Sequence, residues 1–359
     1  MRRRTNDGRR TPYTLYFRHS SFVIRPIVKA QVLAAPNNVD ANPLTFTDIP
    51  TPTPRPREIR IRVSACGVCH TDLHICEGEI HPAFLPIVPG HQIVGIVEEQ
   101  GRGAEKFSIG TRVGVPWLNF IDADCKWFNT DRENLCEDIR FTGFDTNGGF
   151  AESICIDENF AYAIPDAFDD VHAAPLLCAG VIGYRALRLS EISRGEILGL
   201  FGFGASAHIV LQIARFWHKR VFVFTRSEKH QQHARELGAE WVGSANETPP
   251  QQLDSAIIFA PVGDLIVRAL ELSERGATIV HAGVHSSAIP SFDYALLYHE
   301  RTIRSAANST RRDVQELLEL AAQIPIRTEI TTYPFTDANR ALQDVKHSRV
   351  NGATVLQIT

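Results

Sequence analysis

The spacing of hydrophobic and polar positions changes once along the chain, near Cys178. Before that point, apolar residues form short pieces divided by prolines and glycines, and residues 58–65 alternate strictly between polar and apolar side chains. Such alternation is typical of a half-buried strand. Further strands are expected over residues 30–35, 93–101, 111–116 and 148–156. Many short strands without a long amphipathic helix predict a β-rich, barrel-like domain.

After Cys178, apolar runs of strand length alternate with segments of helical spacing. Residues 206–217 form the clearest amphipathic helix, with Ile209, Ile213 and Phe216 near one face. Strands are expected over residues 195–204, 220–225, 255–261 and 277–283, and helices over 181–192, 227–238, 263–276, 311–323 and 334–347, before a last strand at 353–359. This alternation predicts a doubly wound parallel sheet, hence an α/β fold.

Composition narrows the class of protein. The 359 residues suffice for two domains, and 44% hydrophobic with 22% charged residues is an ordinary globular balance. A formal net charge of −4 argues against nucleic acid as a partner. No run reaches the length of a membrane span. Seven cysteines are too few for a disulfide scaffold, and their odd number predicts reduced thiols in the cytoplasm.

The first 28 residues differ from the rest, because several arginines lie among Thr, Asn and Gly without an apolar core of signal-peptide length. We expect a flexible N-terminal arm or a consequence of start-site choice, with a transit peptide as the alternative. We assign this segment no function.

Candidate metal-binding residues cluster in two segments, CGVCHTDLH at residues 66–74 and GHQIVG at residues 90–95. Cys69 and His91 are donors that zinc accepts, and His70, His74 and Asp72 lie in the same turn as Cys69. Other interpretations stay open at this point. C-x-x-C also occurs in redox loops, and single cysteines and histidines are often buried packing or hydrogen-bonding residues.

A glycine-rich loop stands between an apolar strand and the amphipathic helix. Gly202 and Gly204, followed by Ala205, match a dinucleotide-binding loop, with Ala207 at the place of a third glycine. Such glycines permit a tight turn and close approach of a pyrophosphate to the helix N-terminus. The alternative is a plain tight turn.

The end of the next strand should contact the adenosine ribose. It carries Thr225, Arg226 and Ser227 and no carboxylate. A guanidinium between hydroxyls suits a 2′-phosphate, whereas a carboxylate would repel it, so NADP(H) is favoured, with NAD(H) as the alternative. Arg226 could instead stack on the adenine or be solvated.

Together these motifs resemble the zinc-dependent alcohol dehydrogenases of the medium-chain dehydrogenase/reductase superfamily, from about residue 29 to the C-terminus. The resemblance is carried by CGVCHTDLH, PGHQIVG, RENLC, GGFAE, PLLCAGVIGYRAL and the glycine loop. It implies a GroES-like β-rich catalytic domain over 29–180 and 313–359, and a Rossmann domain over 181–312.

The resemblance also implies residue roles. Cys69, His91 and Cys178 would hold one catalytic zinc ion, and Cys66 would be core. Asp72 would orient His91, while Thr71 would pass the substrate proton towards His74. The implied cofactor contacts are His70, Val284, Ala205 and the residues named above for the glycine loop and the second strand.

Three departures from the family pattern stand out. The lobe that holds a structural zinc in relatives offers Asp122, Cys125, Phe128 and Cys136, so we expect no structural zinc and a lobe held by apolar contacts from Trp127 and Phe128. Gln92 stands where the family usually has a glutamate, which should leave the zinc more electropositive. Ala353 stands where many relatives have an arginine for the pyrophosphate.

The expected function is hydride transfer between an alcohol or aldehyde and a nicotinamide cofactor. A zinc-free reductase and a non-catalytic cofactor-binding sensor are the alternatives. Trp117 and Leu118 are expected to line a site for a small or medium apolar group, although Trp117 could be ordinary core. By resemblance we expect a homodimer formed through edge strands near residues 284–306.

Overall fold

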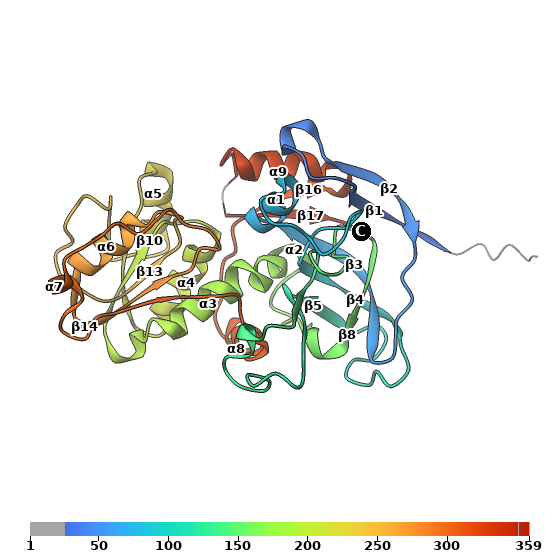
Figure 1. Cartoon of the computed structure of the whole chain (residues 1–359), viewed down its shortest axis with the longest axis horizontal. Helices are drawn as coiled ribbons and strands as arrows, with labels where there is room; N and C mark the ends of the chain where they lie inside the picture. Colours follow the sequence, from blue (N-terminus) through green and yellow to red (C-terminus); the bar gives the residue numbers. More distant parts are fainter. Residues whose placement is uncertain (1–25, 351, 359) are drawn as a thin grey trace, which may run out of the picture.

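A six-stranded parallel sheet forms one half of the molecule in the computed structural model, which describes residues 26–350 and 352–358 (Figure 1). The strand order β12-β11-β10-β13-β14-β15 is that of a doubly wound Rossmann sheet. Its strands are β10 (Ile197–Phe201), β11 (Arg220–Phe224), β12 (Trp241–Gly243), β13 (Leu253–Ile258), β14 (Ser273–His281) and β15 (Thr302–Ser305). The short strand β12 was not predicted.

Alternate residues of these strands enter two different apolar clusters. Leu198 and Leu200 of β10 pack with α4, whereas Ile197 and Phe201 of the same strand pack with α6. Burial of both faces explains why the strands are continuous apolar runs. The helices of this half are α4 (Ala205–Phe216), α5 (Glu228–Glu236), α6 (Asp264–Glu271) and α7 (Tyr294–Leu297). The predicted amphipathic helix is present, with Ile209 and Ile213 buried, but Phe216, the last residue of α4, is 46% exposed.

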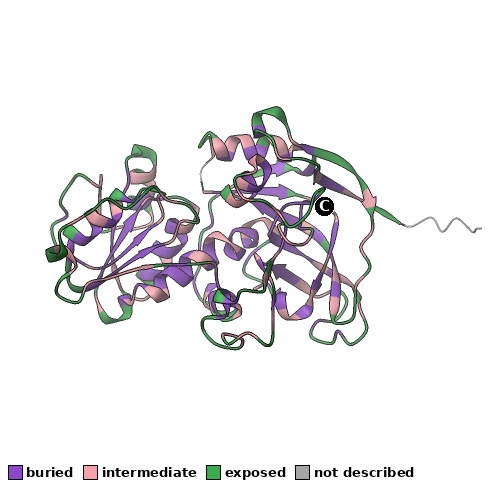
Figure 2. Cartoon of the chain, in the orientation of Figure 1, coloured by how far each residue is buried: buried purple, intermediate pink, exposed green. Residues whose placement is uncertain are grey.

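The other half is built on a β-rich sheet that contains strands from both ends of the chain. The order is β16-β17-β3-β4-β5-β9, and β8 pairs with β3. These strands are β3 (Glu58–Val68), β4 (Gln92–Gln100), β5 (Arg112–Val115), β8 (Ser153–Asp157), β9 (Tyr162–Ala163), β16 (Ile330–Pro334) and β17 (Ala353–Gln357). Figure 2 shows that the central strands of both sheets are buried.

Two small strand pairs and several helices complete this half. The pairs are β1 (Ile27–Leu33) with β2 (Leu44–Pro50), and β6 (Leu118–Ile121) with β7 (Ile139–Phe141); the helices are α1 (His70–Glu77), α2 (Asp170–Ala173) and α9 (Ala338–Lys346). Residues 1–25 of the predicted arm lie outside the described residues, and Ile27 and Val28 already pair within β1 and β2. The arm as predicted therefore extends slightly too far.

Two helices lie where the chain passes between the halves. α3 (Ala179–Leu189) leads into the parallel sheet and α8 (Arg311–Ala321) follows its last strand, and the two helices pack together (Figure 1). One apolar cluster joins residues of both sheets, for example Val94 of β4 and Leu200 of β10. Among the described residues, none of the helices combines the length and apolar character that crossing a bilayer requires.

Candidate active site

Cys69 lies where β3 ends and α1 begins. It is the N-cap of α1, its sulfur accepts the Thr71 amide at 3.4 Å, and the Asp72 carboxylate accepts the Cys69 amide at 2.9 Å. This reciprocal capping box fixes the backbone of the first helical turn. The segment that the sequence suggested was a turn is therefore a strand-to-helix junction, which holds the Cys69 sulfur rigidly.

Three side chains from distant parts of the chain meet at this junction. The distances are 3.5 Å from Cys69 Sγ to His91 Nε2, 3.4 Å from His91 Nε2 to Cys178 Sγ, and 4.0 Å between the two sulfurs. Tetrahedral zinc with ordinary Zn–S and Zn–N bonds needs donor separations of about 3.6 Å for S and N and about 3.8 Å for two sulfurs. The donor set and its spacing therefore fit a zinc ion.

The other ring nitrogen of His91 faces a carboxylate. Asp72 Oδ1 lies 3.3 Å from His91 Nδ1 and also accepts the Gly90 amide at 3.1 Å. His91 Nδ1 has no hydrogen-bond partner among the described residues, so its contact with Asp72 is mainly electrostatic. Burial by itself lowers the pKa of His91, but the Asp72 carboxylate and the Cys69 sulfur outweigh it and raise that pKa to about 10.

The two sulfurs favour a cation between them. The neighbouring Cys178 sulfur, followed by burial, raises the pKa of Cys69 well above its usual value. Two thiolates side by side are unfavourable unless a positive charge compensates them, and a metal ion supplies that charge. Of the described residues, only Cys69, His91 and Cys178 form a group of His, Cys, Asp or Glu with metal-ligand spacing.

Aromatic side chains stand beside His91. The ring of Trp117 lies 4.6 Å from that of His91 and is stacked on Phe141 at 4.9 Å, with Phe144 at 5.8 Å. Trp117 is partly exposed, which suits a position at the substrate side of the site. Leu118, by contrast, is fully buried, so it belongs to the core and does not line the site.

The other predicted site residues of α1 lie close to Cys69 in sequence, but they differ in burial and in their hydrogen-bond partners. Thr71 is half-buried, His70 is exposed, and the ring of His74 binds the Glu79 carboxylate. Although the side chain is exposed, partial desolvation by the surrounding protein, followed by repulsion from His74, lowers the pKa of His70. Gln92, next to His91, is buried, and its side-chain nitrogen has no hydrogen-bond partner among the described residues.

The glycine loop joins β10 to α4 as expected. Gly202 has a φ of 88°, a conformation that glycine adopts without strain, and Gly204 is the N-cap of α4. A Cβ atom at Gly204 would meet no atom within 4 Å, so there is open space beside the residue that caps α4. Ala207 is completely buried, as close packing of this helix on the sheet requires.

A cavity of about 290 Å³ adjoins this loop at the carboxyl ends of the parallel strands. It contains residues that the sequence analysis missed, above all His208, Lys229 and His233. The ring of His233 forms an ion pair with Glu329, from the other half of the chain, at 2.9 Å. The cavity thus lies at the edge of the sheet where a dinucleotide binds in such folds. The full lining is Phe203, Gly204, His208, Lys229, His230, Gln232, His233, Glu236, Glu329 and Gly352.

The other predicted cofactor contacts belong to different elements and differ in how far they are buried. Thr225 is buried after β11, while Arg226 and Ser227 are exposed, and Ser227 caps α5. Val284 is 78% exposed on the loop after β14. Ala353 is a buried residue of β17. Lys229 and His230 follow Ser227 by two and three residues, and this proximity was the only sequence signal that they line the cavity.

The lobe after β6 differs from the prediction. Cys125 and Cys136 form a disulfide, so the expectation that all seven cysteines are reduced thiols was wrong for this pair. Trp127 and Phe128 do pack against the apolar core, as predicted, but the covalent bond is an additional constraint. The spacing of the cysteines could not reveal the pair, because a disulfide depends on how the chain between them folds.

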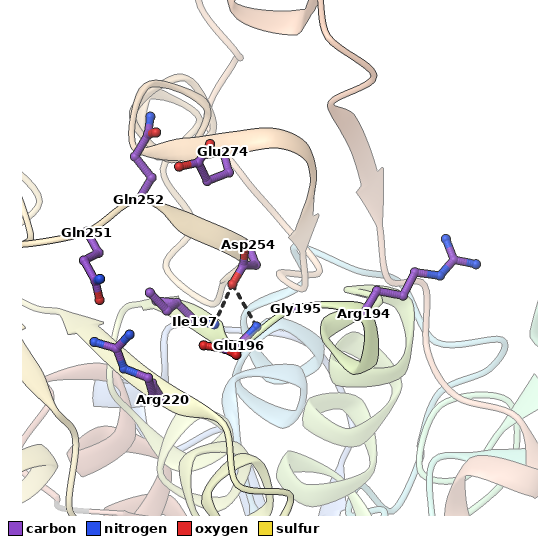
Figure 3. A pocket seen from close by; sticks show the side chains of 9 residues that line it. All are labelled: Arg194, Gly195, Glu196, Ile197, Arg220, Gln251, Gln252, Asp254 and Glu274. Carbon is purple, nitrogen blue, oxygen red and sulfur yellow. Dashed lines mark hydrogen bonds between the residues drawn. The ribbon is translucent and has the colours of Figure 1, made fainter.

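A second depression, of about 530 Å³, lies at the opposite edge of the parallel sheet (Figure 3). Its polar groups are already engaged: Asp254 accepts the amides of Glu196 and Ile197, each at 2.8 Å, and Arg220 pairs with Glu240 outside it. The amino ends of parallel strands do not bind the ligand in such folds. We assign it no role.

Comparisons with known proteins agree with this geometry. Residues 55–166 match the family described as "Alcohol dehydrogenase GroES-like domain", and residues 207–323 match the "Zinc-binding dehydrogenase" family. A probable alcohol dehydrogenase, AdhA, of Mycobacterium tuberculosis is 42% identical over 329 residues, which cover 90% of this chain and 95% of the relative. An alcohol dehydrogenase of Geobacillus stearothermophilus is 32% identical over 82% of this chain and 90% of its own length.

Solved structures show the same fold. A thermostable alcohol dehydrogenase from Pyrobaculum aerophilum has a TM-score of 0.84 at 24% identity, covering 93% of this chain and 100% of that one. The fold and the Cys-His-Cys group define a two-domain metal-dependent oxidoreductase. The chain belongs to the zinc-dependent alcohol dehydrogenases of the medium-chain dehydrogenase/reductase superfamily. It transfers a hydride between an alcohol or aldehyde and a nicotinamide cofactor.

Proposed function

We propose that Cys69, His91 and Cys178 hold the single catalytic zinc ion of each subunit, with a fourth position open to the substrate oxygen. The observation that carries this proposal is the triangle of donor atoms, whose sides of 3.5, 3.4 and 4.0 Å fit tetrahedral zinc. A bound zinc ion supplies Lewis-acid chemistry at the alcohol or carbonyl oxygen. Asp72 orients His91 through their 3.3 Å contact and offsets the positive charge.

We propose that Thr71 and His74 move the substrate proton. The Thr71 hydroxyl would accept the alcohol proton, and the ring of His74, which binds Glu79 near the surface, would receive it through the cofactor ribose. We propose that His70, which is exposed on the same helix, contacts the cofactor. The nicotinamide cofactor accepts or donates the hydride, and these side chains supply alignment and proton transfer.

The cofactor is proposed to be NADP(H) in preference to NAD(H). No carboxylate stands at Thr225, Arg226 or Ser227, and the exposed Arg226 is free of ion pairs within the described part of the chain. The cavity beside the glycine loop adds Lys229 and His230 as further cationic or hydrogen-bonding groups for phosphate. These groups would compensate for Ala353, which offers no charge to the pyrophosphate.

The proposed substrates are small or medium alcohols and aldehydes with an apolar group. Support comes from Trp117, which stands between His91 and the rings of Phe141 and Phe144. An aromatic side chain favours apolar groups and stacks on planar ones.

We further propose a cytoplasmic homodimer, with a catalytic domain over 29–180 and 313–359 and a cofactor domain over 181–312. The edge strand β15 and the segment before it support the interface. Large apolar side chains are exposed there, among them Val284, Ile289, Tyr294 and Tyr298. Such a patch is typical of a contact surface. Mass measurement in solution tests the dimer, and Tyr294→Asp together with Tyr298→Asp should yield monomers.

Metal analysis combined with kinetics tests the site. The purified protein should contain one zinc per subunit and show alcohol-dependent reduction of NADP⁺ that chelation abolishes. Cys178→Ala should lose both, whereas Cys155→Ala, at a free cysteine outside the site, should keep them. Activity that persists without zinc would instead support the zinc-free reductase, and cofactor binding without any turnover would support the sensor.

A further inference from the structure

We propose that the loop closed by the Cys125–Cys136 disulfide positions the metal ligand Cys178 through α8, with Glu133 as the positioning residue. The inference rests on the ligand set proposed above. It is carried by a continuous series of contacts from the disulfide loop to α8, and from α8 to the first turn of α3.

Glu133 fastens the loop to the start of α8. It lies in the 3-10 helix Glu133–Leu135, directly before Cys136, and is only 3% exposed. Its carboxylate accepts the backbone amide of Arg311 at 2.7 Å and the guanidinium of the same residue at 2.8 Å. Because Arg311 is the first residue of α8, the negative charge also lies at the favourable end of the helix dipole.

A second group of charges joins α8 to α3. Asp313 of α8 is fully buried, and its carboxylate accepts bonds from Arg185 and Arg188 of α3. Asp131 of the loop also binds Arg188 at 2.8 Å, but its side chain is 44% exposed, so solvent weakens this pair. Glu133, which is almost fully buried, is therefore the stronger of these two carboxylate anchors.

α8 in turn sets the position of the first turn of α3. A Cβ atom at Gly180 would come within 3.0 Å of Leu317 of α8, so the two helices touch closely there. Gly180 lies two residues after Cys178. The Cys178 carbonyl accepts the Ile182 amide at 2.9 Å, which is a hydrogen bond of the first turn of α3. A shift of α8 would therefore move the backbone that carries the Cys178 sulfur.

The disulfide keeps the loop in the shape that presents Glu133. It joins residues 11 positions apart, and the side-chain amide of Asn134 within the loop donates to the carbonyl of Ala307, which precedes α8. Without the covalent bond the loop would sample more conformations, and ordering it against α8 would cost entropy.

The test is the rate at which zinc leaves the holoenzyme for a colorimetric chelator, well below the melting temperature of each variant. Glu133→Gln should release zinc about three- to tenfold faster than the wild type. This effect is smaller than the loss of metal affinity, about 10–100-fold, that is typical when the direct hydrogen-bond partner of a metal ligand is removed. Cys125→Ser combined with Cys136→Ser should do the same. Both should lower kcat more than they change KM for the cofactor, and Glu133→Asp should recover part of the difference.

Matched controls separate positioning from general loss of stability. Glu137→Gln changes an exposed carboxylate next to Cys136 that forms no ion pair among the described residues, and Cys155→Ser changes a free cysteine. Both should release zinc at the wild-type rate. A lower melting temperature with unchanged zinc release in Glu133→Gln and in the double serine variant would overturn the inference. If Cys178→Ala keeps its zinc, the proposed ligand set is wrong and the inference fails with it.

Discussion

The Asp72 carboxylate lies 3.3 Å from Nδ1 of His91, and both side chains are completely buried or nearly so. The same carboxylate also accepts the backbone amides of Cys69 and Gly90. One side chain thus contacts the start of α1, the approach to β4 and the imidazole. These contacts support the proposal that Asp72 orients His91.

Asp72→Asn should weaken zinc binding about 10–100-fold, because the amide preserves the shape but removes the negative charge that faces His91. Competition with a chelator of known affinity measures the change. Asp124→Asn, at an exposed carboxylate outside the site, should bind zinc like the wild type. Equal zinc affinities for Asp72→Asn and wild type would contradict an orienting role for Asp72.

The denatured, metal-free protein should expose five reactive thiols before reduction and seven after it, since Cys125 and Cys136 are paired and the other cysteines are free. A chromogenic thiol titration in denaturant measures both numbers. The Cys125→Ser and Cys136→Ser double variant should give five in both conditions. Seven thiols in the unreduced wild type would show that the bond does not form in the isolated protein.

The structure predicts a loss of stability at mildly acidic pH through His208. Burial lowers the pKa of His208 to about 4, compared with 6.5 for a free histidine. Between these two pH values, the unfolded chain binds a proton at His208 that the folded chain does not. The free energy of unfolding therefore falls as the pH decreases from 6.5 to about 4. Above this window His208 causes no loss of stability. The contribution is about 3 kcal/mol at most.

His208→Gln should therefore flatten the pH dependence of stability between about pH 4 and 6.5, as measured by denaturant unfolding at several pH values. His218→Gln, at an exposed histidine, should leave the wild-type slope. An unchanged slope in His208→Gln would assign the acid sensitivity to other groups.

Arg226→Glu should shift the cofactor preference towards NAD(H). A carboxylate at this place repels a 2′-phosphate and accepts hydrogen bonds from the ribose hydroxyls. Loss of the charge-assisted contact should lower the ratio of kcat/KM for NADP⁺ to kcat/KM for NAD⁺ by about 10–100-fold. Arg235→Glu makes the same change on an exposed face of α5 and should leave the ratio unaltered. The proposed preference is wrong if the wild type already uses NAD⁺ as well as NADP⁺.

Several features of the fold could be predicted from local patterns. The alternation of apolar strands with helices predicted a doubly wound parallel sheet, and the glycines at 202 and 204 lie where a strand turns into a helix. Both follow from near neighbours along the chain: side-chain alternation, strand length and the freedom of glycine to adopt positive φ. The resemblance then supplied the three proposed ligand residues, whose side chains lie together in the structure.

Other features required the tertiary structure. Phe216 fits the apolar stripe of α4, yet it is exposed, because helical spacing does not say where the packed surface ends. The residues around Cys69 looked like a turn, whereas the capping box with Asp72 makes them the start of a helix. Short and weakly apolar strands such as β12 and β16 are formed by pairing with a neighbour, which local composition does not encode.

The sequence by itself determined which donor atoms and which backbone conformations are present: two thiols and an imidazole of zinc-ligand type, a glycine loop, and apolar strands of the right length. Only the tertiary structure decided which of these meet. Cys69 and Cys178 are separated by 109 residues and still bring their sulfurs within 4.0 Å. Cys125 pairs with Cys136, and Glu133 reaches the start of α8. Such contacts depend on the packing of whole elements, and that packing is a property of the folded chain rather than of any local pattern.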